Sequence, residues 1–324
     1  MGCSDAEAQT VLSQSCDELR GGLSRSAQGL GDLLCRFAAW LCPKPREPQP
    51  KPSCGEPTSL SPASCLANEL EGGSWSHDSR AILTRTALLA GDADATREAF
   101  RLGQELEGNG WSHAARAFLA QAALLARSPA ALREAFTLAQ ELEGNFWSHE
   151  GRAILTIAAT TAPSAAAMRR AFAQAQELEG GGWTHESRAI LTVAALTASS
   201  ATKLREAFAL AQELEGNFWS HEGRAILTIA ALTAPSTTKL REAFALADAL
   251  ESGGWTHESR AILTQAALLA GSPENTRKAF AQAEELNPSL WSHEGRAGQA
   301  FNAALSFADP SRARQPLVFH HHAR

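Results

Sequence analysis

Residues 147–182 read WSHEGRAILTIAATTAPSAAAMRRAFAQAQELEGGG, and residues 219–254 read WSHEGRAILTIAALTAPSTTKLREAFALADALESGG. Both stretches are 36 residues long and close to identical, so they are copies of one unit. The repeat extends in both directions, because tryptophans recur every 36 residues: Trp75, Trp111, Trp147, Trp183, Trp219, Trp255 and Trp291. Self-similarity at a period of roughly 20 to 50 residues indicates a solenoid or a propeller.

Each unit predicts two helices. Ser220 is a good N-cap, and Glu222 stands in the first turn, where the helix dipole favours a negative charge. The run RAILTIAALTA follows without a helix breaker, and Pro235 ends it before a second helix over residues 237–252. The units lack the alternating β-branched pattern of strands, which excludes a propeller or a β-solenoid.

A helix pair of this length buries its apolar stripe only by stacking on its neighbours. The units share the residues that such stacking requires: Leu83, Leu119, Leu155, Leu191, Leu227 and Leu263 on the first helix, and Phe100, Phe136, Phe172, Phe208, Phe244 and Phe280 on the second. We expect the repeated tryptophans, such as Trp183, to be largely buried as well. The sequence therefore predicts an all-α fold, a right-handed α-solenoid of stacked antiparallel helix pairs with a short N-terminal helical segment.

The last full unit contains a spaced set of residues that resembles a known repeat: Leu263, Gly271, Phe280, Ala283, Leu286 and Pro288. The set resembles the tetratricopeptide repeat, in a divergent form whose unit is two residues longer than usual. Another α-solenoid family is the alternative. The resemblance implies a superhelix whose concave face, lined by the first helices, holds a peptide or a protein.

The composition along the chain predicts four segments. They are an N-terminal helical segment over residues 1–42, a Pro-rich linker over 43–64, the α-solenoid of six full repeats and partial terminal units over 65–308, and a flexible tail over 309–324. The linker holds seven of the fourteen prolines. In the last first-helix, Gly298 and Gln299 replace the Ile-Leu of the repeat, which is typical of a terminal cap.

The N-terminus and the cysteines bear on location. The chain opens Met-Gly-Cys-Ser, which makes Gly2 a candidate myristoylation site and Cys3 a candidate palmitoylation site. No secretory signal and no apolar run of about 18 residues is present, so membrane association depends on lipidation. All six cysteines stand at or before Cys65 without a C-x-x-C pair. This clustering favours a reducing, cytoplasmic compartment and disfavours a zinc site.

Two further sets of residues recur once per unit, and we call them the histidine ladder and the arginine ladder. One consists of His77, His113, His149, His185, His221, His257 and His293, and the other of Arg80, Arg116, Arg152, Arg188, Arg224, Arg260 and Arg296. Neighbouring histidines stand one repeat apart, on the order of 10 Å, too far to share a metal ion. We therefore expect them to pack or to form hydrogen bonds at the turns between repeats. We expect the arginines to pair with second-helix glutamates such as Glu105, Glu141, Glu177 and Glu213, with ligand binding as the alternative.

The residues that differ between units point to a binding face. Ten residues after each tryptophan stand Arg85, Gln121, Ile157, Val193, Ile229 and Gln265, apolar at the centre and polar at the ends, like the core and rim of an interface. Near the start of the first helices stand Asp78, Glu150, Glu186, Glu222, Glu258 and Glu294, with Ala114 as the exception. We predict that both sets bind a partner through an exposed groove. The alternative is that the acidic residues only complement helix dipoles.

The repetition argues against catalysis, because an active site is a single unlike constellation and no catalytic motif interrupts the units. No cofactor or metal is expected. The charge of −6 argues against a nucleic-acid partner. We predict a monomeric scaffold or adaptor that binds a protein or peptide segment. The alternatives are an RNA-binding helical-repeat protein of the pentatricopeptide type, or an adaptor anchored to a membrane by lipid.

Overall fold

The chain divides into two compact units, Met1–Ser53 and Cys54–Arg324. The computed structural model describes residues 54–71, 76–106, 111–143, 148–179, 183–215, 220–250, 256–286 and 292–308, all in the second unit. Gly2, Cys3, the N-terminal helical segment, residues 43–53 of the linker and the tail after residue 308 lie outside the described residues.

The described residues form fourteen α-helices and no strand. The first helices of the units are α4 (His77–Ala90), α6 (His113–Leu125), α8 (His149–Thr161), α10 (His185–Thr197), α12 (His221–Thr233), α14 (His257–Ala270) and α16 (His293–Leu305). The second helices are α3 (Leu60–Glu71), α5 (Ala93–Leu106), α7 (Pro129–Glu143), α9 (Ala165–Glu179), α11 (Ala201–Glu215), α13 (Thr237–Leu250) and α15 (Pro273–Leu286). The all-α repeat is therefore confirmed.

The predicted signals set the helix bounds. Ser220 is the N-cap of α12, and its side chain accepts a hydrogen bond of 2.9 Å from the amide of Gly223. Each of the other first helices likewise begins one residue after a Ser or Thr N-cap. Helix α12 ends at Thr233, two residues before Pro235. Local sequence therefore fixes the helix pair within each unit.

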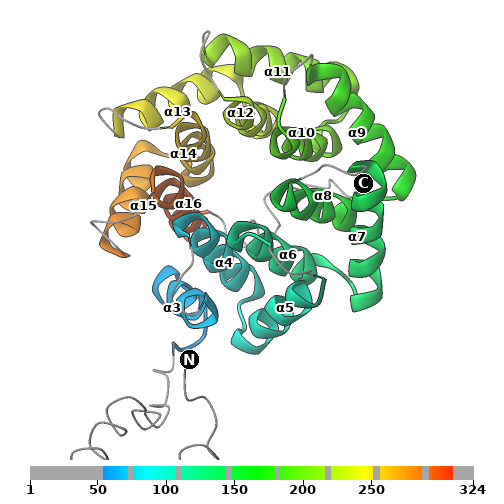
Figure 1. Cartoon of the computed structure of the whole chain (residues 1–324). Coiled ribbons are helices and arrows are strands. Elements are labelled where there is room, and N and C mark those ends of the chain that lie inside the picture. The colour runs from blue at the N-terminus through cyan, green and yellow to red at the C-terminus, as the bar shows by residue number, and fades with distance from the viewer. Residues whose placement is uncertain are drawn as a thin grey trace, which may run out of the picture. The chain divides into compact units, whose positions relative to one another are not determined.

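The helices form two concentric layers in which the first helices lie inside and the second helices outside (Figure 1). Between the layers lie the repeated leucines, Leu83, Leu119, Leu155, Leu191, Leu227 and Leu263, each fully buried. This confirms the predicted core. Of the tryptophans that the structure describes, Trp111 and Trp183 are partly buried, and each packs against a phenylalanine of the outer layer.

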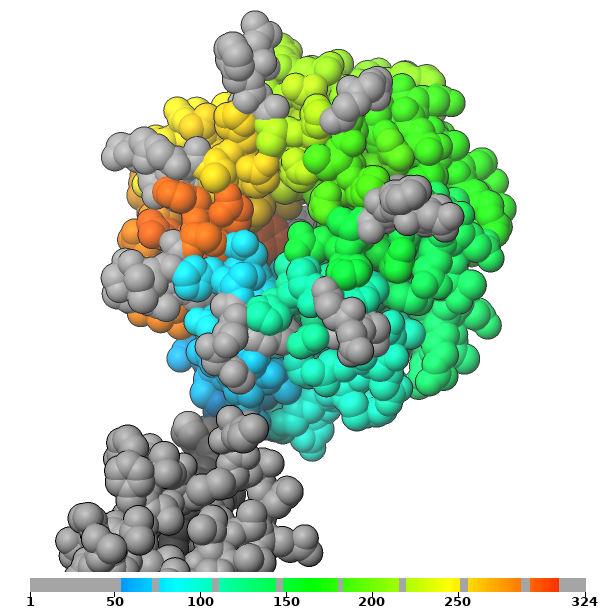
Figure 2. Space-filling model, viewed as in Figure 1, coloured from blue at the N-terminus to red at the C-terminus, as the bar shows by residue number. Residues whose placement is uncertain are grey.

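The array closes on itself. Helix α16 packs against α4 about as extensively as α4 packs against α6, so the inner helices form a continuous ring (Figure 1). Figure 2 shows the blue side chains from the start of the array beside the orange ones near its end. Each outer helix packs mainly on the inner helix that follows it in the chain, from α3 on α4 to α15 on α16, so closure needs only the contact between α16 and α4. The expectation of an open superhelix is therefore replaced by a ring of seven inner and seven outer helices within the described residues.

The seam between α16 and α4 contains buried side-chain hydrogen bonds. The side-chain amide of Gln299 donates a hydrogen bond of 3.0 Å to Oγ1 of Thr84, and that of Asn302 donates one of 2.8 Å to the carbonyl of Ala81. Gln299 and Asn302 are buried. A Cβ atom at Gly298 would lie 2.9 Å from Cβ of Ala81, so glycine permits the close approach. Gly298 and Gln299 are thus part of an interface, and their interpretation as a terminal cap is wrong.

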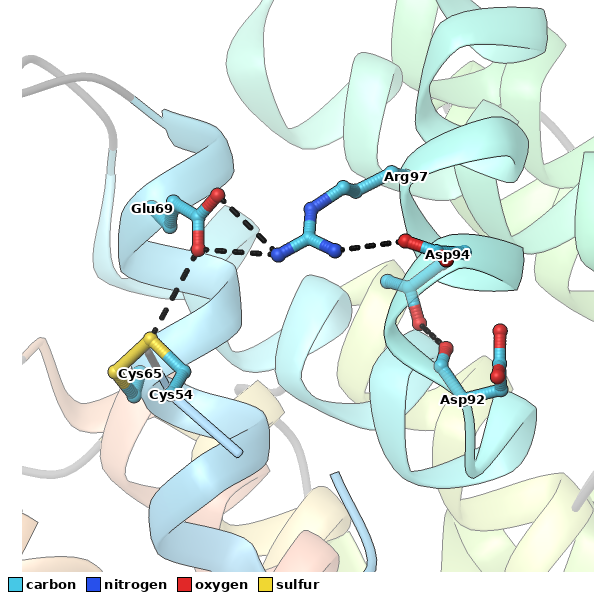
Figure 3. Close-up of polar contacts among 7 residues, drawn as sticks. Cys54, Cys65, Glu69, Asp92, Asp94 and Arg97 are labelled. Carbon is cyan, nitrogen blue, oxygen red and sulfur yellow. Dashed lines mark hydrogen bonds and ion pairs between the residues drawn. A yellow bond between two sulfur atoms is a disulfide. The ribbon is translucent and has the colours of Figure 1, made fainter. Parts of the chain in front are cut away.

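Helix α3 is tied to its surroundings at two points, which Figure 3 shows together. A disulfide joins Cys54 to Cys65 on the helix. On the next outer helix, Arg97 lies between Glu69 of α3, at 3.4 Å, and Asp94, at 2.9 Å. The array therefore begins at Leu60, inside the segment assigned to the linker. Disulfides persist chiefly in oxidising compartments, so this bond does not support the inference of a reducing compartment from cysteine clustering.

Within the described ranges, no helix combines the length and the apolar character needed to cross a bilayer.

Candidate functional site

A cavity of about 620 Å³ lies at the centre of the ring, and all seven inner helices of the described region contribute to its lining. The inner helices run parallel to one another, since each alternates with an antiparallel outer helix. Equivalent positions of the units therefore meet as layers around the cavity. The lining begins at the N-caps of these helices and reaches the level of Asn302.

The first layer is a ring of carboxylates at the N-terminal ends of the inner helices. Its members are Asp78, Glu150, Glu186, Glu222, Glu258 and Glu294, with Ala114 in the seventh place. Several are held by the N-cap hydroxyl of the preceding unit: Ser112 donates to Glu150 at 2.7 Å, and Ser292 donates to Asp78 at 2.6 Å across the seam. Two roles were predicted for these carboxylates, partner binding and complementing helix dipoles. Both fit this position, because the carboxylates meet the positive ends of the helix dipoles and also surround the cavity.

Crowding of like charges affects this layer. Burial raises the pKa of Asp78, and the neighbouring carboxylate of Glu294 raises it further, against the hydrogen bond from Ser292 and the charge of His77, which lower it. A cation that entered the ring would relieve this repulsion, since an opposite charge favours the ionised form of a carboxyl group.

The second layer is apolar. Seven residues after each tryptophan position, the side chains that face the cavity are Ile82, Phe118, Ile154, Ile190, Ile226 and Ile262, with Gly298 in the seventh place. This layer was not singled out from the sequence, although its isoleucines recur at the repeat period. It gives the cavity apolar walls below the carboxylates, the usual composition of a pocket for an organic ligand.

The third layer consists of the six residues predicted from their variability, together with Phe301. All of them line the cavity: Arg85, Gln121, Ile157, Val193, Ile229, Gln265 and Phe301. The expectation of an exposed stripe in an open groove is wrong, because Ile157 and Val193 are only 4% and 3% exposed. Ring closure turns the predicted concave face into the wall of a central cavity.

Arg85 is the one cation among the side chains that line this cavity, apart from the imidazole of His113. Its Nε and Nη2 atoms are buried and have no hydrogen-bond partner within the part of the chain that the structure describes. Its guanidinium lies 4.9 Å from the centre of the Phe301 ring on α16. Burial lowers its pKa to about 10, which leaves the group charged at neutral pH. The cavity is thus lined by a cation with two nitrogen atoms that lack a partner among the described residues.

The arginine ladder has a structural role, with different partners from those predicted. Arg188 pairs with Glu179 at 2.6 Å and Arg224 with Glu215 at 2.6 Å, where Glu177 and Glu213 were expected. Residues two apart on a helix are rotated by about 200°, so only the later glutamate faces the inner layer.

The glutamates that were expected pair instead along the outer surface. Glu177 binds Arg205 at 3.3 Å, and Glu213 binds Arg241 at 2.7 Å. Both members of each of these pairs are more than half exposed. They bridge neighbouring outer helices and lie on the other side of the layer from the cavity.

The histidine ladder links consecutive units, as predicted. The Nδ1 atom of His185 accepts a hydrogen bond of 3.2 Å from the amide of Ser148, and that of His257 accepts one of 3.0 Å from the amide of Ser220. The ring of His221 stacks on Trp183 at 4.7 Å. No cluster of three or more His, Cys, Asp or Glu side chains suited to a metal ion occurs in the described parts of the chain.

A comparison of the chain with protein-family models, with curated proteins and with solved structures finds no match.

Proposed function

We propose that the ring is a non-catalytic binding module that takes a short, extended peptide segment of another protein into its central cavity. The observation that supports this most directly is the layered lining, with carboxylates at the N-terminal end of the inner helices and isoleucines below them. A segment with a basic side chain beside apolar ones complements these layers.

The size of the cavity determines the form of the segment. The cavity, of about 620 Å³, has room for a short segment. The carboxylate layer and the Arg85 layer are separated by seven residues of helix, a rise of about 10 Å. Three residues of an extended chain span about 10 Å. We therefore propose an extended segment that enters end-on.

Several features support binding over the alternatives. The residues of the upper layers recur from unit to unit, whereas catalysis needs a unique constellation. The carboxylate layer would repel phosphates, which disfavours an RNA ligand. The resemblance to the tetratricopeptide repeat, which we retain as part of this proposal, also assigns the binding face to the first helices. A closed ring leaves no inner helix uncovered, which is compatible with action as a monomer.

The test uses a fluorescein-labelled peptide, Gly-Gly-Gly-Lys-Val-Ile-Val with an amidated C-terminus, and the full chain. The double variant Glu186→Gln, Glu258→Gln removes two carboxylates from the cavity layer and should weaken binding about tenfold. The matched control Glu177→Gln, Glu213→Gln makes the same charge change on the outer surface, where both glutamates pair with arginines. It should leave the affinity within about twofold.

Fluorescence anisotropy gives both affinities. A second peptide with glutamate in place of lysine should bind more weakly than the first. Equal loss of affinity in both double variants, or equal binding of the two peptides, would show that the carboxylate layer does not select the ligand and would refute the proposal.

A further inference from the structure

The base of the cavity contains a feature that a basic, apolar segment does not explain. The Nε and Nη2 atoms of Arg85 are buried there and have no partner among the described residues. Burying an unpaired charge is costly. By contrast, Arg80 on the same helix α4 is paired: its Nε donates to Glu71 of the outer helix α3 at 2.8 Å.

Among the described residues, no carboxylate lines the cavity beside Arg85. At its own layer the neighbouring side chains are the Phe301 ring, against which the guanidinium lies, and Gln121 on the next inner helix. The carboxylates of the cavity belong to the first layer, about 10 Å away along the helix axis. The intervening layer is apolar. Two atoms of the guanidinium, Nε and Nη2, therefore lack a partner beside the cavity, and no carboxylate of the described residues lines the cavity at that level.

We infer that Arg85 is an anion-binding subsite and that the ligand carries a carboxylate that reaches it. This inference rests on the proposed function, and it specifies the ligand further. An unpartnered guanidinium offers a fork of N–H donors whose geometry matches a carboxylate. Together with the acidic layer, it selects a ligand with a terminal carboxylate, an apolar body and a cation about 10 Å from the carboxylate.

Two sources offer this chemistry. One is the free C-terminus of a protein that ends in apolar residues preceded by a basic one. The other is a small aliphatic molecule with an amine at one end and a carboxylate at the other. The two share every group that the cavity recognises, and they differ in whether a longer chain continues beyond the cation.

The first experiment compares the peptide Gly-Gly-Gly-Lys-Val-Ile-Val as a free acid with its C-terminal amide. Wild-type protein should bind the free acid at least about tenfold more tightly, as expected for a charge-assisted pair. Arg85→Met should reduce this preference to within about twofold. The matched control Gln121→Met changes a polar side chain of the same layer and should keep the preference.

A second measurement, the melting temperature, distinguishes loss of the subsite from unfolding of the variant. Because Nε and Nη2 of Arg85 are buried without a partner among the described residues, Arg85→Met should raise the melting temperature while it abolishes the preference for the carboxylate. Arg85→Lys keeps the charge and should keep part of the preference. A positively charged side chain retained only for packing would give the opposite pattern: loss of stability with no change in the ratio of the two affinities.

The two sources are separated with 8-aminooctanoate, tested by thermal shift and by competition with the labelled peptide. Competition that Arg85→Met removes points to a small molecule, and binding of the free-acid peptide alone points to a protein C-terminus. Equal affinity for acid and amide in wild-type protein overturns the carboxylate subsite and leaves the proposed function standing. If neither peptide nor 8-aminooctanoate binds, both proposals fail.

Discussion

The amide of Ser292 donates a hydrogen bond of 2.9 Å to Nδ1 of His77, although the two residues are 215 positions apart. The same bond joins Ser148 to His185 within the chain, 37 positions apart. The closing junction of the ring therefore reuses a contact of the ordinary repeat. The first and last inner helices meet as if they belonged to consecutive units.

Gly298 provides a test of this junction. Replacing a glycine by alanine inside a helix usually stabilises it, by roughly 0.5 to 1 kcal/mol. At Gly298 the added Cβ would lie 2.9 Å from Cβ of Ala81, so Gly298→Ala should lower the free energy of unfolding. Urea denaturation measures the change. A gain in stability would show that α16 does not approach α4 so closely.

Deletion of one unit, residues 183–218, separates a ring from an open array. In an open solenoid, the loss of one internal unit leaves a folded protein of slightly lower stability. In a closed ring the remaining units must change their curvature or separate at the α16–α4 seam. We expect the seam to open. Small-angle X-ray scattering should then give a radius of gyration no smaller than that of the full chain, whereas a smaller radius would show that six pairs close without strain.

Glu215 predicts a pH dependence. Burial raises its pKa to about 7 from 4.5, in spite of the bond from Arg224, which lowers it. The folded state therefore holds this proton more tightly than the unfolded state, so the stabilisation is complete below about pH 4.5 and is lost as the pH rises through 7. Glu215→Gln keeps an acceptor for Arg224 and cannot ionise. Its melting temperature should rise relative to wild type between pH 4.5 and 7.5.

The matched control for this measurement is Glu213→Gln on the same helix. Glu213 also pairs with an arginine, Arg241, but its side chain is 59% exposed. Its melting temperature relative to wild type should stay nearly constant over the same pH range, because exposed pairs contribute little. If the two variants behave alike, burial of Glu215 does not control its titration.

Val193 tests the position of the third layer. Its side chain is 3% exposed and packs with Ile154 and Ala189. Val193→Asp should cost several kcal/mol, on the order of the 3 to 5 kcal/mol for an uncompensated buried charge. Val193→Ala should cost less. Thermal unfolding of both variants measures this, and a fall of only a few degrees for the aspartate would place residue 193 in contact with water.

The sequence determined the helix pairs because their signals are local. Ser220 and Pro235 bound a helix whatever the rest of the chain does, and Leu227 lies on its buried stripe. Closure could not be derived in this way, since it depends on small rotations summed over all the units. One signal was present: Gln299 is polar at a position where the six preceding units have leucine.

The sequence predicted which residues face the candidate site, but it did not predict that they line a cavity instead of an open groove. The variable positions and the carboxylates do face one space. Whether that space is a groove or a cavity depends on closure, so the burial of Ile157 could not be foreseen. The same holds for Arg85, because its solitary position beside Phe301 exists only once α16 meets α4.

The contact between the first and last inner helices of the array has a consequence for synthesis. At about 5 to 20 residues per second, α16 leaves the ribosome roughly 10 to 40 s after α4. During that interval the face of α4 that carries Ala81 and Thr84 lacks its cover, since both residues contact α16 in the finished ring. The α16 of another copy presents the same Gln299 and Asn302. Crowded polysomes therefore favour exchanged dimers, whereas a chain made alone closes on itself.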